Sequence, residues 1–153
     1  MKYLFTVFIV IFISSCQSDE GENIIKDFTE QNENEILNYI NDNNLDAQKS
    51  NSGLYYVIQQ QGDGARPTVN SNVTVIYKGY YTNGNIFDES NGEGITFNLQ
   101  QVIAGWTEGI TYFKEGGKGL LLVPSRLAYG SSDARGIPGG SVLIFEIELS
   151  EVK

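Results

Sequence analysis

Hydrophobic and polar positions follow a period of two along most of the chain after its first third. Segments 54–58 and 73–81 are rich in β-branched and aromatic residues, and in segment 141–152 apolar residues alternate with glutamates. This alternation is typical of antiparallel strands that bury one face. Turn sequences separate the strands, and Asn83-Gly84 favours a tight hairpin because both residues tolerate positive φ. The pattern therefore predicts a mainly antiparallel sheet.

Two segments instead show the spacing of three and four that is typical of amphipathic helices. Trp106, Ile110 and Phe113 have this spacing and predict a short helix that ends before the glycines at 116–117. Residues 22–45 have it too, and they predict a helical segment in two pieces. We expect this segment to be a cap packed on the domain, with a dimerisation arm as the alternative. An antiparallel sheet wrapped on one helix is an α+β fold.

The N-terminus has the layout of a secretory signal peptide. Lys2 precedes an apolar run at 3–13 that is interrupted only by Thr6. This run is too short to span a bilayer, because a spanning helix needs about 20 residues. The sequence Ile-Ser-Ser-Cys at 13–16 resembles the bacterial lipobox, in which the cysteine is acylated and becomes the first residue of the mature chain. We therefore expect lipid attachment at Cys16, with a free buried thiol as the alternative.

The resemblance to the lipobox implies a protein that is exported to the bacterial cell envelope and held at the outer membrane by acyl chains such as palmitate. Acidic residues after the cysteine would form a polar tether. They either solubilise the tether or direct the protein to the surface, so the face of the membrane stays open. The chain then divides into a signal peptide (1–15), a lipid-anchored tether (16–22), a helical segment (23–50) and a folded domain (52–153).

Composition excludes several classes of function. The chain has 19 acidic and 10 basic residues, and this excess of acid argues against a nucleic-acid partner, because phosphate contacts require clustered Lys and Arg. Histidine is absent and there is one cysteine, so imidazole-based triads, Cys/His nucleophiles and zinc sites lack their parts. The acidic spacing of a calcium loop is absent as well. We expect neither a metal nor a cofactor.

Six short blocks between residues 77 and 149 combine aromatic, glycine and apolar positions. They are Tyr77-x-Gly79, Phe87-Asp88, Val102-Ile103-x-Gly105-Trp106, Leu127-Ala128-Tyr129-Gly130, Ile137-Pro138 and Phe145-x-Ile147-Glu148-Leu149. In order and spacing these blocks resemble the FKBP family of peptidyl-prolyl cis/trans isomerases, over residues 52–152. The resemblance implies a twisted antiparallel sheet curled around the helix that starts near Trp106, with an aromatic pocket between them.

The resemblance also implies roles for individual residues. Trp106 would form the floor of the pocket and Asp88 would be its one charged residue, while the Ile103 N–H and the Tyr129 hydroxyl would contact the ligand. Taken singly, Ile103 and Phe145 would be core residues and Asp88 a turn residue, and only the joint pattern favours a site. The residues implied for catalysis are Tyr77, Phe87, Asp88, Trp106, Tyr129 and Phe145, and those implied for substrate binding are Val102, Ile103, Ile137 and Ile95.

Two positions depart from the family's pattern. Gly139-Gly140 stands where the family commonly has a second proline and a polar residue, and it predicts a more flexible loop over the pocket. Ile95 stands where many members place a bulkier aromatic residue on the pocket wall. We expect this to weaken the binding of large macrolide inhibitors such as rapamycin and to affect catalysis less.

The implied activity is acceleration of X-Pro bond rotation in exported proteins, with proline-containing polypeptides as substrates. Rotation costs about 18–20 kcal/mol because resonance gives the C–N bond double-bond character. An aromatic pocket disfavours the charge-separated planar amide, so catalysis needs no acid, base or nucleophile. We expect the domain to act as a monomer. The alternatives are a chaperone that binds proline-containing loops with little turnover and a structural lipoprotein of an envelope complex.

Overall fold

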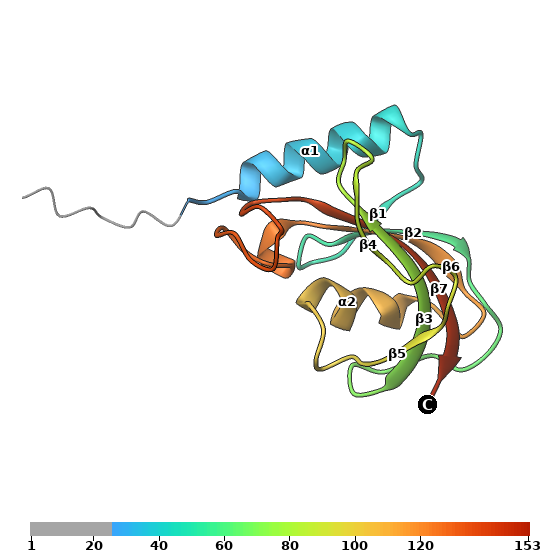
Figure 1. Cartoon of the computed structure of the whole chain (residues 1–153). Helices are drawn as coiled ribbons and strands as arrows, with labels where there is room; N and C mark the ends of the chain where they lie inside the picture. The colour runs from blue at the N-terminus through green and yellow to red at the C-terminus, as the bar shows by residue number, and fades with distance from the viewer. Residues whose placement is uncertain (1–25) are drawn as a thin grey trace, which may run out of the picture.

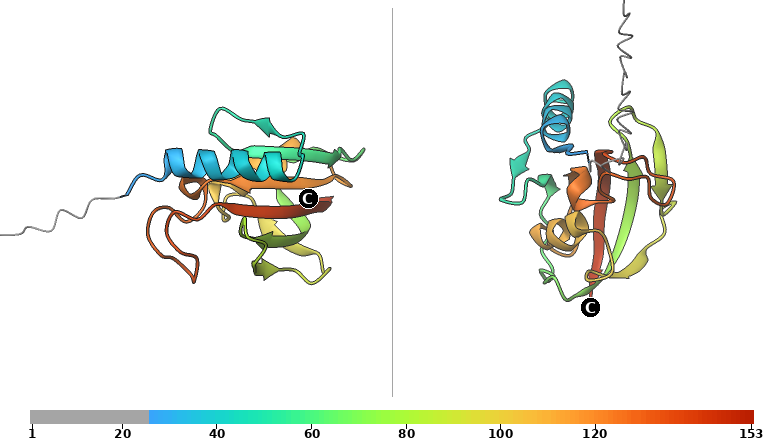
Figure 2. Two further views of the ribbon diagram at one scale, coloured as in Figure 1. Left: turned by 90° about the horizontal axis from the view of Figure 1, so that it is seen from above. Right: turned by 90° about the vertical axis from the view of Figure 1, so that its left-hand side faces the viewer.

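The computed structural model describes residues 26–153. The predictions for the signal peptide at 1–15, for acylation of Cys16 and for the tether at 16–22 lie outside the described residues. Within the described part, an antiparallel sheet carries helix α1 on its outer face and helix α2 on its inner face (Figures 1 and 2). The predicted α+β class, with a twisted sheet curled around a short helix, is confirmed.

The sheet contains seven strands in the described residues, and all its neighbouring strands are antiparallel. Their spatial order is β1-β2-β6-β7-β3-β4, and β5 also pairs with β3. The last strand of the chain therefore lies in the middle of the sheet, between β6 and β3. The strands are β1 (Gln48–Lys49), β2 (Tyr55–Gln60), β3 (Asn72–Tyr80), β4 (Ile86–Glu89), β5 (Ile95–Asn98), β6 (Lys118–Val123) and β7 (Leu143–Val152).

Strand β7 has the predicted two-sided pattern. Its residues Leu143, Phe145, Ile147 and Leu149 are buried in the inner core, while Glu146 is exposed on the outer face. Strand β6, by contrast, has no alternating pattern and was not predicted. The physical reason is that both of its faces are covered, so that apolar residues occupy successive positions.

The turn between β3 and β4 differs from the prediction. Gly84 has a φ of +84°, but Asn83 is not in the left-handed region, so the turn is not the type that needs positive φ at both central residues. Instead, the Gly84 N–H donates to the Tyr81 carbonyl at 2.8 Å, and the Tyr81 N–H donates to the Asn85 carbonyl at 3.0 Å. This longer turn leads into β4, which carries Phe87 and Asp88.

Helix α2 (Ala104–Gly109) continues as a 3-10 turn (Ile110–Tyr112) against the inner face of the sheet. The predicted apolar residues Trp106, Ile110 and Phe113 are all buried there, as expected. A Cβ on Gly105 would meet the Val123 side chain at 2.5 Å, so this glycine lets α2 approach β6 closely.

Helix α1 is a single helix (Thr29–Asp42), so the prediction of two helical pieces over 22–45 is wrong. Asn44 has a positive φ just after its end, and residues 43–50 form a turn and strand β1. Ile36 is fully buried on the outer face of the sheet, where it packs in a cluster with residues of β2, β6 and β7. The helix is therefore a cap on the domain, as predicted. No helix within residues 26–153 is long and apolar enough to cross a membrane.

Candidate functional site

A cavity of about 600 Å³ lies between the inner face of the sheet and the start of α2. Its volume is within the range of small-ligand sites, and its lining is mainly aromatic and aliphatic, as in such sites. The lining residues are Tyr77, Phe87, Asp88, Phe97, Gln101, Val102, Ile103, Ala104, Trp106, Ala128, Tyr129, Arg135 and Phe145.

Trp106 packs against the other aromatic rings of this cavity. Its ring is perpendicular to those of Tyr77, Phe97 and Phe145, with centroid distances of 5.1, 5.3 and 5.3 Å. Such edge-to-face packing is favourable because the positive ring edge meets the negative ring face. The indole is 4% exposed, and its buried N–H has no hydrogen-bond partner within residues 26–153. The indole thus forms an apolar floor of the cavity, and its N–H group donates no hydrogen bond to the described residues.

The side of the cavity formed by Phe87 and Phe145 depends on a glycine. The two rings are perpendicular, with centroids 5.6 Å apart, and both lie over Gly79 of β3. A Cβ on Gly79 would meet the Phe87 ring at 2.7 Å and the Phe145 ring at 3.0 Å. The glycine two residues after Tyr77 is therefore required by the packing of these rings.

Tyr77 and Asp88 form the polar edge of the cavity. The Tyr77 hydroxyl donates a hydrogen bond to Asp88 Oδ2 at 2.8 Å, between the neighbouring strands β3 and β4. Burial and this bond to the carboxylate raise the pKa of Tyr77 to about 12. The backbone of Tyr77 is held by Ser90, whose Oγ accepts from the Tyr77 N–H at 3.1 Å. The phenol therefore stays protonated at neutral pH and orients the carboxylate.

Ile103 offers a backbone donor at the start of α2. It precedes the helix in an extended conformation, with φ of −61° and ψ of 149°. Its carbonyl accepts from the N–H groups of Trp106 and Thr107, whereas its own N–H has no hydrogen-bond partner within residues 26–153. Thr107 Oγ1 also donates to the Leu99 carbonyl at 2.6 Å and holds this turn in place. Ile103 lines the cavity, so its free N–H is available to a bound molecule.

The loop between β6 and β7 supplies Tyr129 and Arg135, and Gln101, before α2, is the remaining polar residue of the lining. The Tyr129 hydroxyl has no hydrogen-bond partner in the described part of the chain. Arg135 is exposed, has a φ of +54°, and makes neither a hydrogen bond nor an ion pair within residues 26–153. It is the one cationic side chain of the cavity lining. Resemblance assigned no role to Arg135, and no local pattern in the sequence identifies it.

Eight of the residues predicted for the site come together around the cavity. They are Tyr77, Phe87, Asp88, Val102, Ile103, Trp106, Tyr129 and Phe145.

Two predicted residues lie elsewhere. Ile137 is 7% exposed and packs in the inner core beneath the loop rather than lining the cavity. Ile95 is 38% exposed near the start of β5, and the aromatic place on the wall belongs to Phe97, two residues further along the same strand. Residues two apart share one face of a strand, so the alternation in this segment could have identified Phe97.

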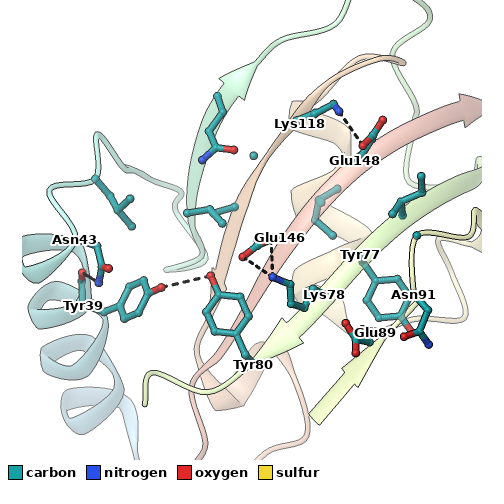
Figure 3. A pocket seen from close by; sticks show the side chains of 17 residues that line it. Tyr39, Asn43, Tyr77, Lys78, Tyr80, Glu89, Asn91, Lys118, Glu146 and Glu148 are labelled. Atoms are coloured by element: carbon teal, nitrogen blue, oxygen red, sulfur yellow. Dashed lines mark hydrogen bonds and ion pairs between the residues drawn. The ribbon is translucent and has the colours of Figure 1, made fainter. Parts of the chain in front are cut away.

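A second hollow, of about 520 Å³, lies on the outer face of the sheet beside the end of α1 (Figure 3). Four of its five charged side chains form ion pairs, Lys78 with Glu146 and Lys118 with Glu148, and only Glu89 makes none within residues 26–153 (Figure 3). Because the paired charges are satisfied and exposed, they offer little to a ligand. Within residues 26–153 no group of three or more Asp, Glu, His or Cys side chains is placed to hold a metal ion. The aromatic cavity is therefore the candidate site.

Comparisons with known proteins agree with this geometry. The family model described as FKBP-type peptidyl-prolyl cis-trans isomerase matches residues 64–150. The isomerase FkpA of Buchnera aphidicola subsp. Baizongia pistaciae is 46% identical over 110 residues, which are 71% of this chain and 44% of that protein. FkpA of Escherichia coli K12 is 44% identical over 106 residues, which are 68% of this chain and 39% of that protein. The chain thus spans less than half the length of these relatives.

Two solved structures have the same fold. The crystal structure of FkpA from Escherichia coli superposes with a TM-score of 0.70 at 35% identity, covering 82% of this chain and 62% of that one. A peptidyl-prolyl cis-trans isomerase from Pseudomonas syringae gives 0.71 at 31% identity, covering 82% of this chain and 96% of that one.

Fold and cavity together define a half-open antiparallel sheet that holds an aromatic binding pocket against one short helix. The chain belongs to the FKBP-type peptidyl-prolyl cis-trans isomerase family.

Proposed function

We propose that this chain accelerates the cis/trans rotation of X-Pro peptide bonds in exported proteins. The observation that carries the proposal is the cavity itself, in which Trp106, Phe145 and other aromatic rings surround a space sized for a prolyl residue and its neighbours. Within the described residues the one hydroxyl of the cavity that lies beside a carboxylate is the Tyr77 phenol, and its raised pKa of about 12 makes it a poor nucleophile at neutral pH. Rotation about a peptide bond requires neither a nucleophile nor a base.

The proposed mechanism is transfer of the amide from water to an apolar site. The planar amide is more charge-separated than the twisted transition state, so removal of water disfavours the planar form. The free N–H of Ile103 and the hydroxyl of Tyr129 would bind substrate carbonyls and hold the chain on one side of the bond while the other side turns. Each tenfold gain in rate needs about 1.4 kcal/mol of differential stabilisation.

A peptide isomerisation assay tests the proposal. The purified chain lacking residues 1–15 is added to a short chromogenic X-Pro peptide, and the relaxation rate is followed with and without enzyme. We expect a rate that rises in proportion to enzyme concentration and that falls at least tenfold in Phe145→Ala. A rate equal to the uncatalysed one would refute the activity.

Binding of proline-containing loops without turnover is the second candidate, and it would use the same cavity. Under that reading, Asp88→Val and Phe145→Tyr would abolish peptide turnover but leave the suppression of client aggregation intact. A structural role in an envelope complex would survive loss of the cavity altogether. Rescue of a deletion strain by Phe145→Ala, which removes part of the cavity wall, would therefore favour the structural role.

Envelope anchoring is part of the proposal. The support for it is the apolar run at 3–13 followed by small residues and Cys16, a layout that resembles a lipobox. Two or more acyl chains would be needed for stable anchoring, because one chain binds a membrane only marginally. Radioactive palmitate should label the wild-type chain and a Ser18→Ala control but not Cys16→Ala. Equal labelling of all three would refute lipid attachment at Cys16.

Two further properties belong to the same proposal. Ile36 on α1 is fully buried against the chain's own sheet, which favours a monomer over pairing through this helix. Light scattering of the purified chain would detect a dimer. The wall position that Ile95 was expected to leave open is filled by Phe97, so we propose that macrolide inhibitors bind this cavity and block turnover.

A further inference from the structure

Helix α1 contacts the loop that forms one side of the cavity. The family match begins at residue 64, so α1 (Thr29–Asp42) lies outside it. Yet the start of α1 lies beside the chain between β6 and β7, which contributes Ala128, Tyr129 and Arg135 to the cavity (Figure 1). The contact therefore links a helix outside the matched region to the wall of the proposed active site.

Asn32 makes this contact through both ends of its side-chain amide. Its Nδ2 donates to the Gly140 carbonyl at 2.8 Å, and its Oδ1 accepts from the Ser125 N–H at 2.8 Å. The residue is 1% exposed. One buried side chain thus bridges the two ends of the loop, which are far apart in sequence and close in space. Because each partner is a backbone group, the bridge fixes the position of the chain itself.

The loop is built to receive α1 at Gly140. This glycine has a φ of +79°, and a Cβ on it would meet the ring of Phe28 at 2.2 Å. Gly139 is equally confined, since a Cβ there would meet the Ser131 carbonyl at 2.2 Å. The glycine pair at 139–140, which the sequence suggested would loosen the loop, instead permits a close contact with the residue that precedes α1. The loop and the start of the helix fit together as one unit.

Hydrogen bonds carry this anchorage toward the cavity. The Gly140 N–H donates to the Gly130 carbonyl at 2.9 Å, and the Gly130 N–H donates to the Ser125 carbonyl at 2.8 Å. Gly130 directly follows Tyr129, and Ser125 and Gly140, which Asn32 holds, lie on either side of this tyrosine in the sequence. Loss of the bridge would remove the two hydrogen bonds that tie this network to α1.

We propose that Asn32 is a positioning residue for the isomerase site: it holds the loop so that the Tyr129 hydroxyl faces the substrate. Asn32 itself lies outside the cavity lining. The effect of Asn32 on catalysis rests on the proposed isomerase function, whereas its effect on the loop does not. The two are therefore measured separately.

The experiment uses the chain lacking residues 1–15 and four variants. Asn32→Ala removes both hydrogen bonds, and Asn32→Asp keeps the acceptor for the Ser125 N–H but loses the donor to Gly140. Asn38→Ala is the matched control, because Asn38 is exposed on the same helix and makes no side-chain hydrogen bond in the described residues. Ile36→Ala loosens the packing of α1 on the sheet. The cluster around Ile36 includes Val142, next to β7, but none of residues 125–140.

Hydrogen exchange of the amides at 125–140 reads the loop directly. We expect exchange there to accelerate in both Asn32 variants at temperatures well below their melting transitions, with β3 and β7 unchanged. Ile36→Ala should lower the melting temperature by more than Asn32→Ala does and leave loop exchange at the wild-type value. Equal loop exchange in Asn32→Ala, Asn32→Asp and wild type would overturn the proposal.

Isomerisation kinetics read the consequence for the site. Loss of a hydrogen-bonded bridge typically changes an equilibrium by roughly fivefold, so we expect kcat/KM to fall about that much in Asn32→Ala, mainly through KM. Asn38→Ala and Ile36→Ala should retain wild-type values. A fall in Ile36→Ala as large as in Asn32→Ala would show a general effect of stability and overturn the positioning role. An inactive wild type would refute the isomerase function alone, and loop exchange would still decide the anchorage.

Discussion

Tyr77 and Asp88 are joined across two neighbouring strands by a 2.8 Å hydrogen bond in which the phenol donates to the carboxylate. The bond uses the one acidic group of the cavity lining to orient a side chain rather than to transfer a proton. The same hydrogen bond restricts rotation of the Asp88 carboxylate and keeps it facing Tyr77. The polar edge of the site is therefore a fixed structure, which suits a reaction that needs a shaped, dry surface more than an ionisable catalyst.

Ionisation of Tyr77 should depend on Asp88. The pKa of Tyr77 is raised to about 12 by burial and by the neighbouring carboxylate, so Asp88→Asn should lower it toward the ordinary value near 10. Ultraviolet titration of phenolate absorbance would detect this as one tyrosine that ionises earlier than in wild type. Tyr77→Phe identifies the signal, since it removes that tyrosine from the late-ionising group. An unchanged titration in Asp88→Asn would contradict the assignment.

The same shift has a defined sign for stability. A group whose pKa is higher in the folded state than in the unfolded state stabilises the fold fully below the unfolded value and loses this contribution as pH rises through the folded value. For Tyr77 the window runs from about pH 10 to about pH 12. Between these pH values the free energy of unfolding, measured by urea denaturation, should fall less steeply with rising pH in Tyr77→Phe than in wild type.

Gly79→Ala should disrupt the cavity without any change in its lining residues. The new methyl group would meet the Phe87 ring at 2.7 Å and the Phe145 ring at 3.0 Å, and these rings would have to move into the cavity. Overpacking of this kind costs about 1–3 kcal/mol of stability. We expect kcat/KM for peptide isomerisation to fall about tenfold or more. Gly94→Ala is the control, because a methyl group there meets only the terminal methyl group of Thr74, at 2.8 Å, and no residue of the cavity lining.

The sequence predicted those parts of the fold in which local pattern and tertiary structure agree. Strand β7 alternates from Phe145 to Leu149 because its inner face is buried there while Glu146 on its outer face meets solvent. Helix α2 and the segment directly after it place Trp106, Ile110 and Phe113 on the sheet at helical spacing. Strand β6 was missed because α1 covers the outer face of the sheet, so both faces of β6 are apolar and no alternation remains. Burial on two sides removes the periodic signal.

The site was predictable where one motif fixes one position. Tyr77, Phe87 and Trp106 lie where the motifs place them, because glycine and aromatic residues set their surroundings. The prediction that Ile95 lies on the cavity wall was wrong, and Phe97 lies there instead. Both residues are apolar and belong to the same face of β5, so the sequence pattern does not distinguish them, and only the pairing of β5 with β3 does. Arg135 had no signal, because a loop conformation with positive φ at that position depends on contacts distant in sequence.

Glu108 should make stability sensitive to acid. Burial raises the pKa of this carboxyl, but hydrogen bonds from Ser52 at 2.6 Å and Tyr112 at 2.7 Å outweigh it and hold the pKa below its usual range. A carboxyl whose pKa is lower in the folded state than in the unfolded state stabilises the fold at pH values above the unfolded pKa, here 4.5. This contribution to stability is lost as pH falls through the folded-state pKa. Glu108→Gln should therefore lower the free energy of unfolding at neutral pH. The difference in this free energy between wild type and variant should become smaller below pH 4.5. Urea denaturation at both pH values measures this, and a pH-independent difference would contradict it.

Arg135 should influence which prolyl bonds the site accepts. It is the one cation of the cavity lining, it is exposed, and it has no partner within residues 26–153, so an acidic residue next to the substrate proline would meet an unpaired charge. An exposed ion pair contributes about 0.2–1 kcal/mol, which limits the effect to a few-fold.

We expect Arg135→Ala to lower kcat/KM about two- to fourfold for peptides with Glu before proline, and to leave kcat/KM for peptides with Leu unchanged. The preference should also weaken in high salt, because the charges are screened. Lys153→Ala removes a charge far from the cavity and should change neither peptide; a loss of equal size for Glu and Leu peptides in Arg135→Ala would show that the side chain shapes the loop rather than selecting charge.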